Sequence, residues 1–493
     1  MASELFKTSL TRRSVLAASL TGLLANSFLS KAFGLDPGLS NIILGRPTDT
    51  SIAISILSAE AQMVYVEYGI SKSSLSKKTG TVSLLAGTPL VVELTGLKAN
   101  TKNYYRLKYK KASESTYSMG KVYSFSTAKT VGKTFSFSVQ GDTHPERAGK
   151  MFNADLYSVM MGNVASQQPD FHILLGDDFS IDPLIDKGQA NKSNVENIYR
   201  THRNWLAIAG ATVPIFLVNG NHEQAAAYLL DGTATNPAVL AGNARLKYYP
   251  LPAPNKFYSG DTNQVPNVGL PRDYYSWTWG DALFVSIDPY WHSKQAVDNV
   301  AGVATDSTDK SNGKGGGSGK TSNLWDVGIG DDQYAWLKKT LETSKAKYKF
   351  VFAHHVLGTG RGAVEVSTNY EWGGKDPKGV STFAKERPNW ELPIHDLMVK
   401  NGVSIFFQGH DHIFVTQERD GLIYQSMPNP ADDTFSMFNE NAYITGTKAP
   451  NSGHVRVLIS PSEAKVEYYL AARPQDSNRK NLQLAHSYSV KPK

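Results

Sequence analysis

The sequence contains no cysteine among its 493 residues. This absence excludes disulfide bridges, thiolate metal ligands and a cysteine nucleophile, so any metal site must use nitrogen and oxygen ligands. The excess of positive over negative charge is also small. The formal net charge is only +7, and no basic run resembles a nucleic-acid-binding patch. After the N-terminal region, no apolar segment approaches the ~20 residues that a membrane-spanning helix needs. What remains is a globular chain with room for two to four domains at ~100–200 residues each.

The first 32 residues differ in composition from the rest. Arg12 and Arg13 precede an apolar stretch diluted by Ser, Thr and Asn, and small residues at 30–32 offer a cleavage site. This pattern is typical of a twin-arginine export signal, which predicts the twin-arginine export machinery as a partner and a periplasmic or extracellular location. The alternative is a cytosolic protein in which the arginine pair begins a surface helix.

Residues 39–128 consist of short β-rich runs separated by Gly, Asn, Ser and Thr clusters, with no helical period. Such spacing predicts a small all-β sandwich. The segment 94–107, LTGLKANTKNYYRL, resembles the turn before the tyrosine corner of fibronectin type III domains. Asn103 stands at the position of the aligned tyrosine, with Tyr104 and Tyr105 directly after it.

From residue 134 onward, apolar runs alternate with helical ones, which predicts an α/β domain with a parallel core that extends to residue 493. The tail after 453 reads as antiparallel strands that complete a sheet. The expected strands of the core are 135–139, 171–175, 214–218, 274–288 (two strands), 347–353 and 403–408, and the expected helices are 148–164, 194–208 and 331–346.

Five of these strands end in polar residues, four of them with a glycine at the turn. In open α/β sheets ligands bind at the carboxyl ends of the strands, and glycine lets the next side chain point back over the strand end. The five strand ends are Gly141-Asp142-Thr143-His144, Gly176-Asp177-Asp178, Gly220-Asn221-His222-Glu223, His354-His355 and Gly409-His410-Asp411-His412.

The polar strand ends supply seven candidate metal ligands. Carboxylate, imidazole and amide oxygen without thiolate suit Mn, Fe, Zn or Mg. The D-x-H and H-x-H pairs place two side chains on one side of an extended segment. Seven ligands are too many for one ion and suit two ions that share a bridging carboxylate. The candidates are Asp142, His144, Asp177, Asn221, His354, His410 and His412.

The motif order D-x-H, G-D-x, G-N-H-E, H-H and G-H-D-H, over residues 134–445, resembles the calcineurin-like metallophosphoesterase superfamily. The preceding sandwich and the export signal are similar to its purple acid phosphatase-like branch. The resemblance implies a metallophosphoesterase β-sandwich flanked by helices (αββα) after a fibronectin-like sandwich. It also implies an exported enzyme that hydrolyses phosphate mono- or diesters, such as nucleotides or other small organic phosphates, by attack of a hydroxide that bridges two metal ions.

Carried over by position, the resemblance assigns a role to each candidate. The first ion takes Asp142, His144 and His412, the second takes Asn221, His354 and His410, and Asp177 bridges them. His222 joins Asp177 as a catalytic residue, stabilising or protonating the leaving oxygen. Asp177 is preferred to Asp178, and His354 to His355, because each comes first after its strand or glycine. Ser180 replaces the metal-binding tyrosine of the purple enzymes, which favours Mn, Zn or Fe(II) over a ferric–tyrosinate centre.

The glycine-rich segment 358–374 is the candidate for substrate binding. Arg361 could contact phosphate, and Tyr370 and Trp372 could stack on an organic group. The alternative is a surface loop whose aromatic side chains pack on the domain. A rival to the enzyme hypothesis is a surface-binding protein whose metal site is structural or inactive.

Overall fold

The computed structural model describes residues 41–223, 230–294, 324–356 and 360–493. The predicted export signal at 1–32 lies outside the described residues, as do the first two residues of the segment 358–374. Within the described ranges, no helix combines the length and the apolar character needed to cross a membrane.

The N-terminal region is an all-β sandwich, as predicted from its short alternating runs. One sheet has the order β1-β2-β6, and the other has the order β4-β3-β7-β8, with β5 paired to β3 and β9 paired to β7. The strands of the first sheet are β1 (Asn41–Gly45), β2 (Ile52–Leu57) and β6 (Leu90–Leu94). Those of the second are β3 (Gln62–Gly69), β4 (Lys77–Lys78), β5 (Val82–Leu84), β7 (Lys102–Lys110), β8 (Ser118–Met119) and β9 (Tyr123–Ser126).

The described residues of the larger region form two further sheets. The first has the order β12-β11-β10-β21-β22-β23, and the second has the order β13-β14-β15-β16-β17-β19-β18-β20. The strands of the first are β10 (Phe135–Gln140), β11 (Phe171–Leu174), β12 (Ile215–Leu217), β21 (Gly453–Ile459), β22 (Ala464–Leu470) and β23 (Leu484–Val490). Those of the second are β13 (Ser259–Gly260), β14 (Tyr275–Trp279), β15 (Ala282–Ser286), β16 (Tyr348–Phe352), β17 (Ile405–Gln408), β18 (Phe414–Arg419), β19 (Leu422–Ser426) and β20 (Thr447–Ala449).

The helices cover the outer faces of these two sheets. Three of them begin at an asparagine whose side-chain oxygen accepts a hydrogen bond from the first turn, at Asn153, Asn191 and Asn236. The helices are α2 (Ala154–Gln167), α3 (Asp182–Asp186), α4 (Lys192–Gly210), α5 (Pro237–Tyr248), α6 (Gly330–Thr343), α7 (Tyr370–Gly373), α8 (Phe383–Glu386) and α9 (Ile394–Lys400).

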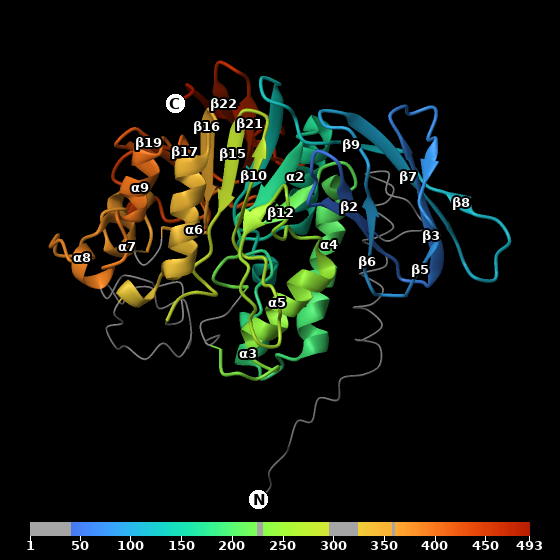
Figure 1. Cartoon of the computed structure of the whole chain (residues 1–493), viewed down its shortest axis with the longest axis horizontal. Coiled ribbons are helices and arrows are strands. Elements are labelled where there is room, and N and C mark those ends of the chain that lie inside the picture. The colour runs from blue at the N-terminus through green and yellow to red at the C-terminus, as the bar shows by residue number, and fades with distance from the viewer. Residues whose placement is uncertain (1–40, 224–229, 295–323, 357–359) are drawn as a thin grey trace, which may run out of the picture.

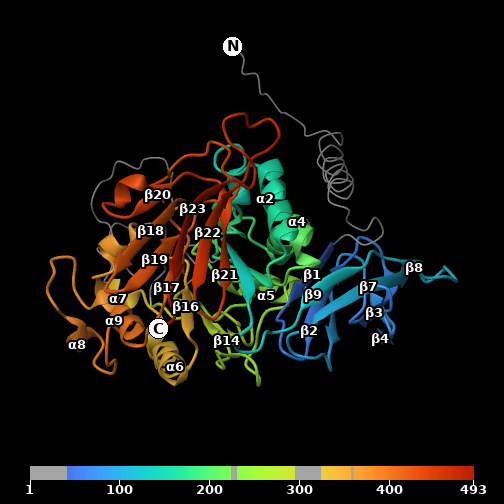
Figure 2. The same ribbon diagram turned by 90° about the horizontal axis from the view of Figure 1, so that it is seen from above.

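The two sheets lie between layers of helices because their strands carry apolar side chains on both faces. Phe350 and Phe352 of β16 face the core between the two sheets, whereas Val351 faces the helices on the outside. Figure 2 shows the strands between α2 and α4 on one side and α6, α7 and α9 on the other. The predicted αββα architecture is therefore confirmed, and β21 pairs antiparallel with β10 as expected of the C-terminal strands.

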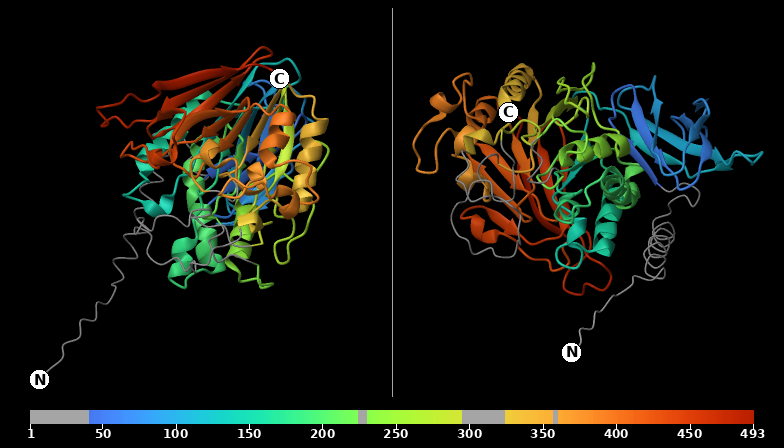
Figure 3. Two further views of the ribbon diagram at one scale, coloured as in Figure 1. Left: turned by 90° about the vertical axis from the view of Figure 1, so that its left-hand side faces the viewer. Right: turned by 90° about the horizontal axis from the view of Figure 1, so that it is seen from below.

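The N-terminal sandwich lies at the opposite end of the molecule from α8 and α9, against α4 (Figures 1 and 3). The fully buried Arg203 of α4 reaches across this boundary. Its Nε donates to Asn41 Oδ1 at 2.8 Å, its guanidinium donates to Ser55 Oγ and O at 3.0 and 3.1 Å, and it also donates to the carbonyl of Tyr248. Tyr105 Oη of the sandwich donates to the Ala211 carbonyl at 2.7 Å. The two regions thus share a buried polar contact.

Candidate metal centre

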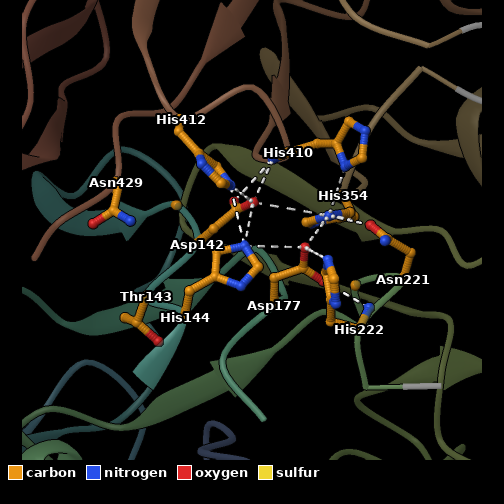
Figure 4. A network of polar contacts seen from close by, with 12 residues as sticks. Asp142, Thr143, His144, Asp177, Asn221, His222, His354, His410, His412 and Asn429 are labelled. Atoms are coloured by element: carbon orange, nitrogen blue, oxygen red, sulfur yellow. Dashed lines mark hydrogen bonds and ion pairs between the residues drawn. The ribbon is translucent and has the colours of Figure 1, made fainter. Parts of the chain in front are cut away.

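Five strand ends converge on one cluster of polar side chains (Figure 4). Strands β10, β11 and β12 run parallel in one sheet, and β16 and β17 run parallel in the other, so their carboxyl ends meet at one edge of the layered core. The structure brings all seven candidate ligands together there, each no more than 4% exposed: Asp142, His144, Asp177, Asn221, His354, His410 and His412.

Four of these residues have left-handed backbone conformations. The φ angles are +49° at His144, +58° at Asp177, +66° at His410 and +53° at His412. Positive φ is uncommon for residues other than glycine, and such strain concentrates at functional sites. The tight backbone is what turns each side chain back over the end of its strand.

Two glycines allow the backbone to approach the carboxylates. A Cβ at Gly220 would lie 2.2 Å from Asp177 Oδ1, and a Cβ at Gly409 would lie 2.3 Å from Asp142 Oδ1. No larger residue fits at either turn without displacing a carboxylate of the cluster. The glycines at the strand ends therefore serve close packing around the acids.

The first group of ligand atoms surrounds Asp142. His412 Nε2 lies 3.0 Å from Asp142 Oδ2 and 3.1 Å from His144 Nε2. The His410 amide donates to both Asp142 oxygens at 2.9 Å, which fixes the carboxylate. Asp142, His144 and His412 thus form one triad whose ligand atoms lie within 4.8 Å of one another.

The second group surrounds His354. Its Nε2 lies 3.1 Å from Asp177 Oδ2, 3.0 Å from Asn221 Oδ1 and 3.2 Å from His410 Nδ1. Asp177 Oδ2 also lies 3.5 Å from His144 Nε2, so this carboxylate stands between the two groups. Asp177 belongs to a triad with His354 and His410 and to another with His144 and His222.

The tautomers of two histidines suit metal binding. His354 Nδ1 lies 2.7 Å from the Leu175 carbonyl, which can only accept, so Nδ1 carries a proton and Nε2 is the ring nitrogen that faces the cluster. His144 Nδ1 donates to Glu146 Oε1 at 2.8 Å, with the same consequence for its Nε2. Metal-ligating histidines donate their other ring N–H in this way.

The charges of the buried side chains in the cluster also favour the binding of cations. Burial lowers the pKa of His354, but the carboxylates of Asp177 and Asp142 outweigh it and raise the pKa to about 10. Burial raises the pKa of Asp177, but the cationic His354 and His222 rings hold it well below its usual value. Because the ring of His354 takes a proton here, the site favours positive charge where the lone pairs converge. The donor set and its charge therefore fit divalent ions.

Asp178 and His355, the sequence neighbours of two proposed ligands, have other partners. Asp178 Oδ1 accepts from Thr143 Oγ1 at 2.8 Å, and burial raises the pKa of this carboxyl well above its usual value. His355 Nδ1 lies 3.1 Å from Tyr290 Oη, and burial lowers the pKa of its ring to about 3. Ser180, at the position of the purple enzymes' tyrosine, is buried, and its hydroxyl has no partner among the described residues.

His222 lies at the edge of the cluster with two partners that the sequence motifs did not identify. Its Nδ1 donates to Asp182 Oδ2, and its Nε2 lies 3.2 Å from an Arg147 Nη. Burial lowers the pKa of His222, but the carboxylates of Asp177 and Asp182 raise it to about 9. Arg147 and Asp182 lie on short helices after the strand ends, where no strand period marks them.

Glu223, the last residue of the G-N-H-E motif, braces the backbone under the cluster. Its Oε2 accepts from the amides of Asp177 and Gly220 at 3.0 and 2.7 Å. Its Oε1 accepts from the amides of Asp178 and Phe179 at 2.7 and 3.1 Å. One buried carboxylate therefore ties the β11 turn to the β12 turn.

The three predicted substrate contacts lie in different surroundings: one is beside the cluster, and two are buried away from solvent. Arg361 donates to the His410 carbonyl, and its Nη1 lies 3.4 Å from Asp411 Oδ1, so it lies beside the cluster and keeps a partly exposed side chain. Its contact with phosphate stays a prediction. The stacking role of Trp372 is wrong, because the residue is fully buried and its Nε1 donates to Tyr424 Oη at 2.9 Å. Tyr370 is buried too and packs edge-on against Trp325.

Known proteins with similar features support the same interpretation. A family model described as calcineurin-like phosphoesterase matches residues 135–414. The fold is similar to that of PhoD, with a TM-score of 0.59, 16% identity, and coverage of 92% of this chain and 90% of that one. It is also similar to purple acid phosphatase PPD1 from yellow lupin (Lupinus luteus) seeds, with a TM-score of 0.56, 15% identity, and coverage of 92% and 75%. No curated protein matches the sequence.

Proposed function

The chain belongs to the calcineurin-like phosphoesterase family, and we propose that it is an exported enzyme whose centre holds two metal ions and hydrolyses small phosphate esters. Membership makes it a metal-dependent phosphoesterase. The observation that carries the proposal of two ions is the position of Asp177, whose Oδ2 lies 3.1 Å from His354 Nε2 and 3.5 Å from His144 Nε2. A carboxylate between two groups of ligands suits a bridging role.

The proposed ligands are those of the two groups described above. Asp142, His144 and His412 would hold one ion, Asn221, His354 and His410 would hold the other, and Asp177 would bridge them. When bound, such ions lower the pKa of water and neutralise charge on phosphoryl oxygens. Oxygen and nitrogen ligands without sulfur suit Mn, Fe, Zn or Mg.

His222 is the proposed proton donor to the leaving oxygen. Its raised pKa, about 9, keeps the ring protonated at neutral pH. Asp182 accepts from Nδ1 and so orients Nε2 toward the cluster, where the ring lies next to His144 and Asp177. Nε2 faces the Arg147 guanidinium, which can only donate, so a proton on Nε2 becomes available to an alkoxide when substrate phosphate takes the guanidinium as its own partner.

Two arginines are the proposed phosphate contacts. Arg147 lies against His222, and Arg361 lies against His410, so the two guanidinium groups lie beside opposite ligand groups. Both side chains are 29% exposed, which leaves them accessible to an anionic substrate. Phosphomonoesters and phosphodiesters of nucleotides or other small organic groups are the proposed substrates.

The test compares hydrolysis of p-nitrophenyl phosphate and bis(p-nitrophenyl) phosphate by the Mn-loaded protein. We expect cleavage of at least one ester, and the faster one identifies the enzyme as a monoesterase or a diesterase. Asp177→Ala is expected to lower the rate by about 100-fold or more, whereas the matched control Asp178→Asn should keep it, because Asp178 Oδ1 accepts from Thr143 Oγ1 and Asp178 belongs to none of the triads found among the described residues. If neither ester is cleaved with Mn, Zn or Fe, the surface-binding protein with an inactive metal site replaces this proposal.

Export rests on the paired Arg12 and Arg13 before the short apolar stretch. We propose that the twin-arginine machinery carries the chain to the periplasm or the exterior and that the segment 1–32 is removed. N-terminal sequencing of the protein recovered outside the cytoplasm tests this: a new terminus close to residue 33 is expected. Recovery of the full-length chain from the cytoplasm alone would contradict export.

A further inference from the structure

A second group of metal-ligand side chains lies outside the centre described above. Asp261 follows β13, Asp273 precedes β14, and His292 lies in the turn after β15. One ligand atom from each residue lies within 4.8 Å of the other two, which is the spacing shown by the three triads of the main centre. The two carboxylates are 1% and 0% exposed.

The carboxylates of this group are incompletely paired. Asp261 Oδ1 accepts from the Asn263 amide at 2.8 Å, and Asp273 Oδ2 accepts from His292 Nε2 at 2.7 Å. The remaining oxygens, Asp261 Oδ2 and Asp273 Oδ1, accept no hydrogen bond from any residue that the structure describes. A buried charged oxygen without a partner is costly, and buried charges are ordinarily paired or bound to a metal.

The surroundings favour a cation over another hydrogen-bond donor. Asp288 is a third acidic side chain close enough to interact with Asp273, and the basic side chain of the group is His292. His292 also lines a cavity of about 440 Å³, whose walls carry more acidic than basic side chains. The charged residues of that wall are Asp326, Asp331, Asp332, Glu386, Lys294 and Arg387. The group therefore borders this cavity on the side of His292.

We propose that Asp261, Asp273 and His292 form a separate site for one divalent transition-metal ion, such as Zn²⁺. Two carboxylates and one imidazole neutralise a divalent ion and give a donor set that Zn²⁺ accepts. The site would act structurally. His292 closes a turn that begins at Asp288, because its amide donates to the Pro289 carbonyl at 3.1 Å.

That turn is connected to the main centre. Asp288 Oδ2 accepts from Asn219 Nδ2 at 2.6 Å, and Asn219 lies two residues before the proposed ligand Asn221. Asp288 Oδ1 also accepts from the amides of Tyr290 and Trp291, which holds the turn closed. An ion at His292 would thus stabilise the turn that supports the β12 strand end.

Zinc counting on paired variants tests the site. We expect His292→Gln to bind one Zn²⁺ per chain fewer than the wild type, measured by elemental analysis after saturation with Zn²⁺ and gel filtration. His395→Gln is the matched control, because His395 also pairs with an aspartate, Asp420 at 2.9 Å, but belongs to no triad among the residues that the structure describes. Equal zinc content in all three proteins would overturn the proposal, whatever number of ions the main centre holds.

A crystal of the Zn²⁺-saturated wild type gives a test that needs no variant. At the zinc absorption edge, an anomalous peak is expected between Asp261, Asp273 and His292, apart from any peak at the main centre. Peaks at the main centre alone would overturn the second site and leave the proposed function intact. A peak at the second site alone would support it and contradict the proposed function.

Discussion

His202 tests how a buried, neutral histidine makes the free energy of unfolding depend on pH. The residue lies on α4, is 1% exposed, and has no hydrogen-bond partner at either ring nitrogen among the described residues. Its ring packs against Phe179, Trp205 and Tyr157 at centroid distances of 4.9, 5.6 and 5.7 Å. Burial lowers its pKa to about 3, whereas an unfolded histidine titrates near ~6.5.

The sign of the effect follows from these two pKa values. Between pH 6.5 and about 3 the unfolded chain binds a proton at His202 that the folded chain does not, so acid favours unfolding. At about 1.36 kcal/mol per pH unit, the loss between pH 7.5 and pH 5.5 is about 1.4 kcal/mol from this residue. His202→Phe removes the titrating group, and we expect the variant to lose about 1.4 kcal/mol less than the wild type over this interval.

Urea unfolding at the two pH values measures this difference, with EDTA present so that metal release does not contribute. The cost of repacking a phenyl ring is the same at both pH values, so it cancels from the comparison. Trp205→Phe perturbs the same contacts without removing a titrating group, and its pH dependence should match that of the wild type. Equal pH dependence in His202→Phe and the wild type would refute the assignment of a buried neutral histidine.

Three further changes follow from single contacts. Asp182→Asn removes one of the two carboxylates that raise the pKa of His222, the other being Asp177, so the basic limb of the pH–rate profile should move to lower pH and the rate on alkyl phosphates should fall about tenfold. Glu223→Gln weakens four hydrogen bonds from backbone amides and should lower the free energy of unfolding by about 3 kcal/mol in urea, with faster metal loss to EDTA. Arg203→Met leaves the buried acceptors of the sandwich boundary unpaired, which should cost about 3 kcal/mol in the same assay.

The ligand cluster was predictable from sequence because parallel strands impose a simple rule. A polar residue directly after a buried parallel strand lies at the edge of the sheet where the neighbouring strands end, so Asp142 and Asp177 could be grouped from the strand pattern alone. His354 follows β16 of the other sheet, and its place in the group came from the resemblance of the motif order. The amphipathic helix expected at 331–346 was also predictable, because its apolar residues recur at helical spacing. The helix α6 (Gly330–Thr343) buries Tyr334, Leu337 and Leu341 as predicted.

The contacts beyond the strand ends were not predictable in this way. Asp182 and Arg147 reach His222 from short helices whose positions depend on tertiary packing, and no local period places them. The burial of Trp372 was not predictable for the related reason that a glycine-rich segment is typical of a surface loop, so the sequence left stacking on substrate and packing on the domain both open. The segment instead forms the one-turn helix α7, which turns the indole into the core beside Phe406. Short strands such as β13 and β20 also leave too little pattern to detect.

The measurement that tests the central claim most directly is a titration of metal-free protein with Mn²⁺, with bound metal and ester hydrolysis followed on the same samples. The wild type and the His292→Gln variant are titrated in parallel, so that ions bound at Asp261, Asp273 and His292 are distinguished from those at the main centre. The account predicts that hydrolysis of the preferred p-nitrophenyl ester rises with the second bound ion and reaches its maximum at two per chain. Full activity with one ion per chain, or activity that survives complete removal of metal, would contradict it.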